Sequence, residues 1–150
     1  METKSPLCHP SQEDKTYSNL VEGPIKDLVI EEINGGAFVE FKGIIRADLV
    51  KNQTVSHIDY EVYFPVAEAI LKQIEQEVLK QFELRTCRIF HSYGTVKVGE
   101  CSLLVQVISK HRKEAFKACS EIVDRIKAEA PVWKQEFYTN QTYQWVHCNH

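Results

Sequence analysis

The chain has 150 residues, of which 43% are hydrophobic and 26% are charged, enough for one globular domain with its own core. Its net charge of -3 gives no broad basic surface, which argues against nucleic-acid binding as the main activity. The sequence contains no run of about 18 apolar residues, so no membrane span is expected. The five cysteines form no CxxC pair and no secretory signal is visible, so we expect a reducing, cytosolic compartment without disulfides, metal or cofactor.

The first third of the chain predicts an arm followed by strands. Residues 1–24 are rich in Ser, Pro, Lys and Glu without an apolar period, and we expect a disordered N-terminal arm before a domain at 25–150. Residues 27–33 alternate weakly and residues 37–41 have strand composition, with a Gly-Gly turn between them. After the polar stretch 48–56, residues 57–64 alternate with period two, which predicts a further strand.

Two helices and two further pairs of strands are predicted in the rest of the chain. Pro65 opens the first helix, whose apolar stripe recurs every four residues, at Val66, Ile70, Ile74, Val78 and Phe82. Residues 85–91 and 102–108 have strand composition and are joined through Tyr93-Gly94 and Val98-Gly99.

Ser109 can cap the second helix, which ends at Pro131. Its apolar positions keep helical spacing: Ala115, Phe116, Cys119, Ile122, Val123 and Ile126. Short strands are expected at 136–138 and 143–146. This order lacks the regular alternation of strand and helix, so the predicted class is α+β.

Positive charge gathers in residues 110–134, where seven Lys and Arg face four Asp and Glu, a local balance of +3. Most of these cations are interpreted as the solvated face of the second helix. Lys127 differs because it follows the apolar Ile126 and lies at the border of the stripe, where partial burial suits proton transfer. Lys134 follows Pro131-Val132-Trp133, and two lysines beside an aromatic wall could hold a flat anion, although spacing alone slightly favours ordinary surface lysines.

A second cationic position lies in the first turn of that helix. His111 and Arg112 meet backbone N–H groups there, which favour a phosphate. The fifteen residues from Arg112 to Lys127 span roughly 22 Å of helix, more than one small ligand can bridge. If both ends serve one ligand, a neighbouring copy must supply the helix start, which predicts a homodimer with composite pockets. Arg46 ends a strand at a polar loop and is either an anion ligand or an exposed arginine.

Several short segments resemble the large subunit of molybdopterin synthase from about Asp27 to the C-terminal region. They are residues 36–43 (GAFVEFKG) with Arg46, residues 60–63 (YEVY), residues 111–116 (HRKEAF), residues 124–127 (DRIK) and residues 131–136 (PVWKQE). Their order and spacing are those of the family. The resemblance implies a domain of the α/β-hammerhead type, with a mainly antiparallel sheet and two main helices.

The resemblance also implies a function. The family transfers sulfur from the C-terminal Gly-Gly thiocarboxylate of a small ubiquitin-like carrier to cyclic pyranopterin monophosphate, in a heterotetramer built on a homodimer. Lys127 and Lys134 would be the catalytic lysines. The other expected site residues would bind the substrate or lie beside it: Arg46, His111, Arg112, Gln135 and Glu136.

The chain departs from the family pattern at two positions. Ser92 stands where the family has an arginine after His91, and Gln135 replaces a second lysine after Lys134. Two other readings therefore stay open: a non-catalytic assembly or regulatory protein with the family fold, and a non-catalytic carrier of phosphorylated pterins or nucleotides.

Overall fold

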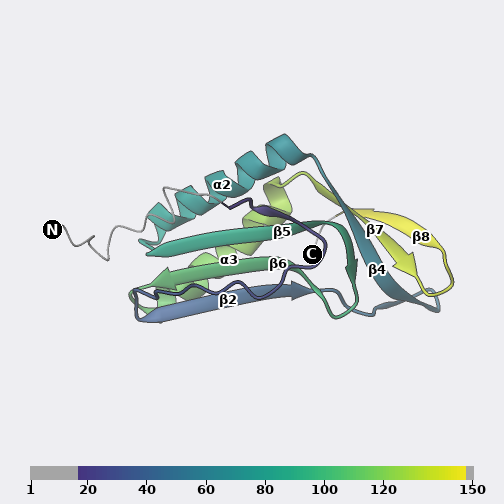
Figure 1. Cartoon of the computed structure of the whole chain (residues 1–150), viewed down its shortest axis with the longest axis horizontal. Helices are drawn as coiled ribbons and strands as arrows, with labels where there is room; N and C mark the ends of the chain where they lie inside the picture. The colour runs from purple at the N-terminus through teal and green to yellow at the C-terminus, as the bar shows by residue number, and fades with distance from the viewer. Residues whose placement is uncertain (1–16, 148–150) are drawn as a thin grey trace.

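The computed structural model describes residues 17–147 and contains one twisted, mainly antiparallel sheet with two helices (Figure 1). The strands are β1 (Leu20–Glu22), β2 (Ala37–Ile44), β3 (Leu49–Val50), β4 (Gln53–Val62), β5 (Thr86–Lys97), β6 (Cys101–Ser109), β7 (Val132–Tyr138) and β8 (Tyr143–His147). The helices are α2 (Phe64–Gln81) and α3 (Arg112–Glu129). The strand order is β2-β6-β5-β4-β7-β8, while β1 pairs with β5 and β3 pairs with β4. The predicted α+β class is confirmed. Neither described helix is long and apolar enough to cross a membrane.

The core forms around β6, whose nine residues are all buried because both faces of the strand are covered. On one face, Val105 and Val107 belong to the same core as Leu71 of α2 and Ile122 of α3. On the other face, Leu104 packs in a second cluster that includes residues of the N-terminal segment. Figure 1 shows α2 and α3 on one side of the long strands, with β4, β7 and β8 gathered at one end.

Helix α2 forms where it was predicted, with Pro65 in its first turn and Lys80 in its last turn, where a cation complements the helix dipole. Its buried line differs slightly from the predicted stripe. Ala67 and Leu71 are fully buried, whereas Val66 is exposed. A spacing of four residues is longer than one helical turn, so a stripe read at that interval drifts around the helix.

Helix α3 also forms as predicted, but two details of the prediction were wrong. Ser109 does not cap the helix: His111 holds the N-cap position without a side-chain bond, and the Ser109 hydroxyl donates to the His111 carbonyl. Phe116, predicted as core, is 60% exposed. The buried face of α3 is formed by smaller residues, Ala115 and Ala118 among them, which allow the helix to approach the sheet closely.

The N-terminal arm was predicted too long, because residues 17–24 are part of the fold. Leu20 is buried in the main core, and β1 pairs in parallel with β5. The Asn19 side chain donates to buried Glu75 of α2 (2.8 Å) and to the Ile89 carbonyl (2.8 Å). One apolar residue and one buried amide make no periodic pattern, which is why composition suggested disorder. Residues 1–16 lie outside the described part of the chain.

The strand predicted at residues 27–33 is absent, because this segment crosses the open face of the sheet without pairing. Leu28 packs beside the Phe90 cluster, and its carbonyl accepts a hydrogen bond from the buried Gln106 side chain (2.6 Å). Conversely, the polar stretch 48–56 contains a hairpin. Lys51 and Asn52 take positive φ angles (49° and 64°) between β3 and β4, the twist that two-residue hairpin turns require.

Two other strands are longer than the sequence predicted. β5 continues through Tyr93-Gly94 to Lys97, so the turn into β6 lies at Val98–Gly99 alone. β7 begins at Val132 rather than at Glu136, directly after Pro131. Lys134 therefore lies inside a strand, and its side chain is fixed by the pleat of the sheet.

Candidate functional site

A cavity of about 400 Å³ lies where the C-terminal part of α3 meets β2, β4 and β7. Most residues that line it are apolar or cationic: Phe41, Lys42, Gly43, Ile44, Ile45, Arg46, Asp48, Ile58, Tyr60, Ser102, Leu103, Val123, Lys127, Lys134 and Glu136. Four cations face two carboxylates, so the lining carries a positive balance. Apolar walls with converging cations suit a flat ligand that carries negative charge.

Lys127 and Lys134 reach the cavity from different elements. Lys127 lies in the last turn of α3, one residue after buried Ile126. Lys134 lies on β7, where only 14% of its side chain is exposed, and its Nζ is 4.0 Å from Oε2 of Glu136. The side chains of Glu136 and Lys134 point to the same face of the sheet, because the two residues are two positions apart on one strand. Two ammonium groups and a carboxylate thus share one partly dehydrated space.

Arg46 and its neighbours form the more exposed side of the cavity. Arg46 Nη2 donates to Asp48 Oδ2 (3.1 Å), and 81% of the arginine side chain is exposed. Lys42 of β2 pairs with Asp27, and the hydrogen bond to this carboxylate raises the pKa of Lys42. Breaking the exposed Arg46–Asp48 ion pair costs little free energy, so Arg46 can reorient towards a ligand. Lys42 stays charged and is held by Asp27.

The floor of the cavity contains a pair of buried hydroxyl groups. Tyr60 donates to Ser102 Oγ (3.1 Å), and both residues are 4% exposed. The Tyr60 ring meets the ring of His91 edge-on, with centroids 5.2 Å apart. His91 is buried and its Nδ1 lies 2.8 Å from the Ser92 carbonyl oxygen. Burial lowers the pKa of His91, so the ring is neutral at physiological pH.

Three of the predicted site residues do not reach this cavity within one chain. His111 and Arg112 are exposed at the opposite end of α3. Gln135 lies on β7 between Lys134 and Glu136, so its side chain points to the other face of the sheet. Arg46, Lys127, Lys134 and Glu136 are brought together. The separation of His111 and Arg112 from the cavity agrees with the length of α3, which is too great for both of its ends to contact one small ligand.

Sequence reasoning missed the residues that complete the cavity. Tyr60 and Ile58 alternate on β4, and this period-two signal could have placed both on the face that meets Lys134. Ser102 and Lys42 gave no signal, because their approach depends on pairings between distant strands. The departure at Ser92 has a local explanation: its hydroxyl is buried and donates to the Gly23 carbonyl (2.7 Å), which holds the end of the N-terminal segment.

Fold and cavity together define an α+β protein with a cationic pocket beside an antiparallel sheet. A model of the family described as MoaE protein matches residues 16–129, which is most of the chain, and the chain belongs to this family.

Relatives support the same assignment. The chain is 36% identical over 139 residues to the molybdopterin synthase catalytic subunit of Pyrococcus abyssi, a match that covers 88% of this chain and 92% of the relative. It is 34% identical over 136 residues to the subunit of that name from Arabidopsis thaliana, covering 87% of this chain and 68% of the relative. These comparisons support a function in molybdenum cofactor biosynthesis, as a molybdopterin synthase catalytic subunit.

Solved structures show the same fold. Molybdopterin synthase from Staphylococcus aureus superposes with a TM-score of 0.76 at 29% identity, covering 89% of this chain and 97% of the other. A complex of subunits 1 and 2 of molybdopterin-converting factor from Helicobacter pylori gives a TM-score of 0.66, covering 86% and 88%. At 20% identity this second likeness shows the fold alone.

Proposed function

We propose that the chain transfers sulfur from a thiocarboxylated partner to cyclic pyranopterin monophosphate, as the catalytic subunit of a cytosolic molybdopterin synthase. The observation that carries the proposal is the convergence of Lys127 and Lys134, from a helix and a strand, in one cavity with apolar walls. The partner would be a small ubiquitin-like carrier with a C-terminal Gly-Gly thiocarboxylate. The relatives named molybdopterin synthase catalytic subunit support a partner, because a catalytic subunit implies at least one further subunit.

For this reaction the protein must position the two reactants and neutralise negative charge. The thiocarboxylate sulfur is the nucleophile: it would displace an oxygen substituent from a substrate carbon and form a thioester to the carrier. Water would then cleave the acyl–sulfur bond, leaving the sulfur on the substrate and returning the carrier as a carboxylate. Two such transfers to neighbouring carbons would give the dithiolene. Lys127, Lys134 and Arg46 would neutralise the phosphate and the negative charge that develops during the attack. One of the lysines would also move a proton, because both lie inside the cavity, within reach of a bound ligand.

The cavity of one chain lacks the phosphate site predicted at His111 and Arg112, and we propose that a second copy supplies it. A two-fold axis near the middle of α3 would place the start of one helix beside the end of the other. Cys119 and Ser120 lie midway between Arg112 and Lys127. A mostly apolar hollow of about 340 Å³ is centred on the same stretch of the helix.

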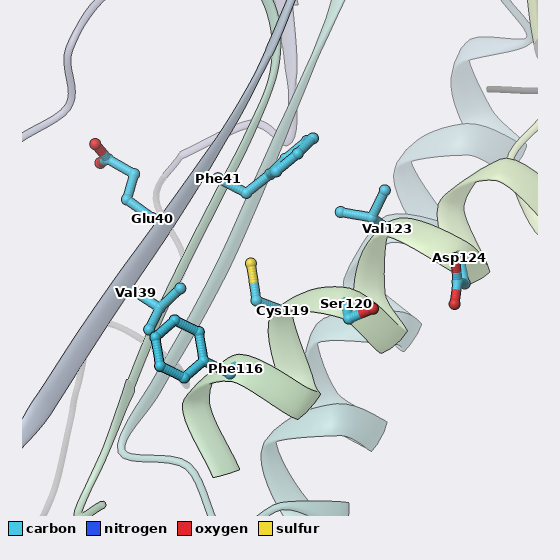
Figure 2. Close-up of a pocket in the computed structure, with 8 residues that line it drawn as sticks. All are labelled: Val39, Glu40, Phe41, Phe116, Cys119, Ser120, Val123 and Asp124. Carbon is cyan, nitrogen blue, oxygen red and sulfur yellow. The ribbon is translucent and has the colours of Figure 1, made fainter. Parts of the chain in front are cut away.

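This hollow suits a second copy of the chain. Figure 2 shows Phe116, Cys119 and Val123 of α3 facing Val39 and Phe41 of β2 across it. β2 is the terminal strand of the sheet in the described residues, so its outer edge can pair with another strand. A two-fold contact uses the same patch on both chains, which a terminal strand beside an exposed phenylalanine can provide. The resulting homodimer with two carriers would be a heterotetramer.

The proposal is tested by assaying product formation from cyclic pyranopterin monophosphate with Lys127→Ala. We expect a loss of at least about 100-fold in rate with the dimer intact, the size of effect that a proton-transferring group gives. Lys80→Ala is the matched control, since Lys80 also lies in the last turn of a helix but is exposed. Near-normal turnover by Lys127→Ala would defeat the assignment, and wild-type protein that binds the carrier without turnover would favour the non-catalytic partner protein.

A further inference from the structure

Three alternate residues of β7 form a row. The first two line the cavity, and the third lies outside its lining. Lys134, Glu136 and Tyr138 share one face of the strand. The Tyr138 hydroxyl donates to Glu136 Oε1 (3.1 Å), while Glu136 Oε2 lies 4.0 Å from Lys134 Nζ. Tyr138 is 6% exposed and belongs to the apolar cluster with Val55 and Ile58. The tyrosine is therefore fixed by packing and holds one oxygen of the carboxylate in place.

The distance between Lys134 and Glu136 is too long for a hydrogen bond. A carboxylate that rotated freely would close on the ammonium to about 2.8 Å, because both side chains are mostly withdrawn from water. A closed ion pair would occupy one of the three ammonium donors and offset the positive charge that an anionic substrate needs. The bond from Tyr138 opposes this rotation. Burial, and then the bond to Glu136, raise the pKa of Tyr138 to about 12, so the hydroxyl remains a donor across the physiological range.

We propose that Tyr138 is a positioning residue that holds Glu136 away from Lys134 and so keeps the Lys134 ammonium available to the substrate. This inference rests on the proposed function, in which Lys134 binds or activates the anionic substrate. It gives Glu136 a different role from the substrate contact expected from the sequence: the position of Glu136 decides whether the N–H donors of Lys134 are available.

A double-mutant cycle in the synthase assay tests the inference. Tyr138→Phe should lower kcat about tenfold, the equivalent of one hydrogen bond to a charged group. In a Glu136→Gln background the same substitution should change kcat less than about twofold, because no carboxylate is left to close on Lys134. Tyr17→Phe is the matched control: Tyr17 also donates to a carboxylate, Glu75 (3.2 Å), but lies outside the cavity lining, and its loss should leave kcat unchanged. Equal losses in both Glu136 backgrounds would overturn the proposal.

A second measurement does not depend on the synthase reaction. The rate at which acetic anhydride labels Lys134, followed by mass spectrometry, reports how accessible the amine of this lysine is. Labelling should slow in Tyr138→Phe and recover in the Tyr138→Phe, Glu136→Gln double variant. If the wild type shows no turnover but this labelling pattern appears, the proposed function fails and the positioning role stands. Unchanged labelling in Tyr138→Phe, with an unchanged melting temperature, would contradict the positioning role itself.

Discussion

His91, at the floor of the cavity, makes the stability of the fold depend on pH. It is buried beneath Tyr60, and burial lowers its pKa from 6.5. The unfolded chain therefore takes up a proton near pH 6.5, whereas the folded chain does so only at lower pH. The free energy of unfolding is retained in full above pH 6.5 and falls as the pH drops below it, by at most about 1.4 kcal/mol per pH unit.

Urea unfolding at pH 7.5 and 5.5 measures this effect. The wild type should lose stability between the two values, and His91→Gln, which lacks the buried imidazole, should lose less. An equal loss in both proteins would show that His91 is not the group responsible.

The residues of the cavity were predictable where their position depended on local spacing. Lys127 follows from its place beside Ile126 on a regular helix, and Arg46 from the end of a strand. Gln135 was misplaced because the predicted strand began at Glu136, which left no basis for assigning alternate faces to Lys134 and Gln135. Tyr138 was predicted in a strand, but its contact with Glu136 depends on side-chain direction that the sequence did not reveal.

Glu75 of α2 binds the N-terminal segment through hydrogen bonds. Its Oε2 accepts hydrogen bonds from the side chain of Asn19 (2.8 Å), the backbone N–H of Ile89 (2.8 Å) and the hydroxyl of Tyr17 (3.2 Å). All of these donors lose a partner in Glu75→Ala. We expect a loss of roughly 2–4 kcal/mol in the free energy of unfolding, together with faster amide exchange in β1.

Glu77→Ala is the control, since Glu77 lies on the exposed side of the same helix and pairs with Arg125 (2.8 Å). It should change stability much less than Glu75→Ala, because exposed ion pairs contribute little. If Glu75→Ala and Glu77→Ala had equal effects on unfolding and on exchange in β1, the role of Glu75 in holding the N-terminal segment would be wrong.

Some helices and strands could be predicted from the local sequence pattern, and others could not. Both helices were predicted close to their true bounds, because apolar spacing, a proline at the start of α2 and Pro131 after α3 all agree. β1 and β3 have three and two residues, too short for any period to emerge. The segment 27–33 carries a weak alternation, but its residues cover the sheet instead of joining it.

The strand order of the sheet could not be predicted from the sequence. β2 pairs with β6 and β4 pairs with β7, and each pairing joins residues that are 57 or more positions apart. Such contacts depend on the global packing of the sheet, which hydrophobic periods do not encode. The separation of the two cationic positions on α3 was the one long-range constraint that the sequence supplied, and it leads to the proposed dimer.

Mixing two inactive variants tests the composite pocket. Arg112→Ala and Lys127→Ala should each be inactive as homodimers, because every pocket lacks one group. After subunit exchange, one pocket of each mixed dimer combines Lys127 of one chain with Arg112 of the other. Random mixing should restore about a quarter of wild-type activity, since half the dimers are mixed and half their pockets are intact.

Phe116→Asp, added to both variants, should yield monomers by sedimentation and abolish the recovery, because a charge would enter the apolar hollow between β2 and α3. No recovery in the mixture, with proven subunit exchange, would place the whole site within one chain.

Isotope labelling of the carrier identifies the source of the dithiolene sulfur. The carrier would be prepared with ³⁴S in its thiocarboxylate and incubated with the chain and cyclic pyranopterin monophosphate, and product and carrier would be weighed by mass spectrometry. We expect both dithiolene sulfurs to be ³⁴S and each consumed carrier to return as a carboxylate. A carrier that binds the chain but keeps its ³⁴S, while the pterin mass stays unchanged, would show that the chain does not transfer sulfur.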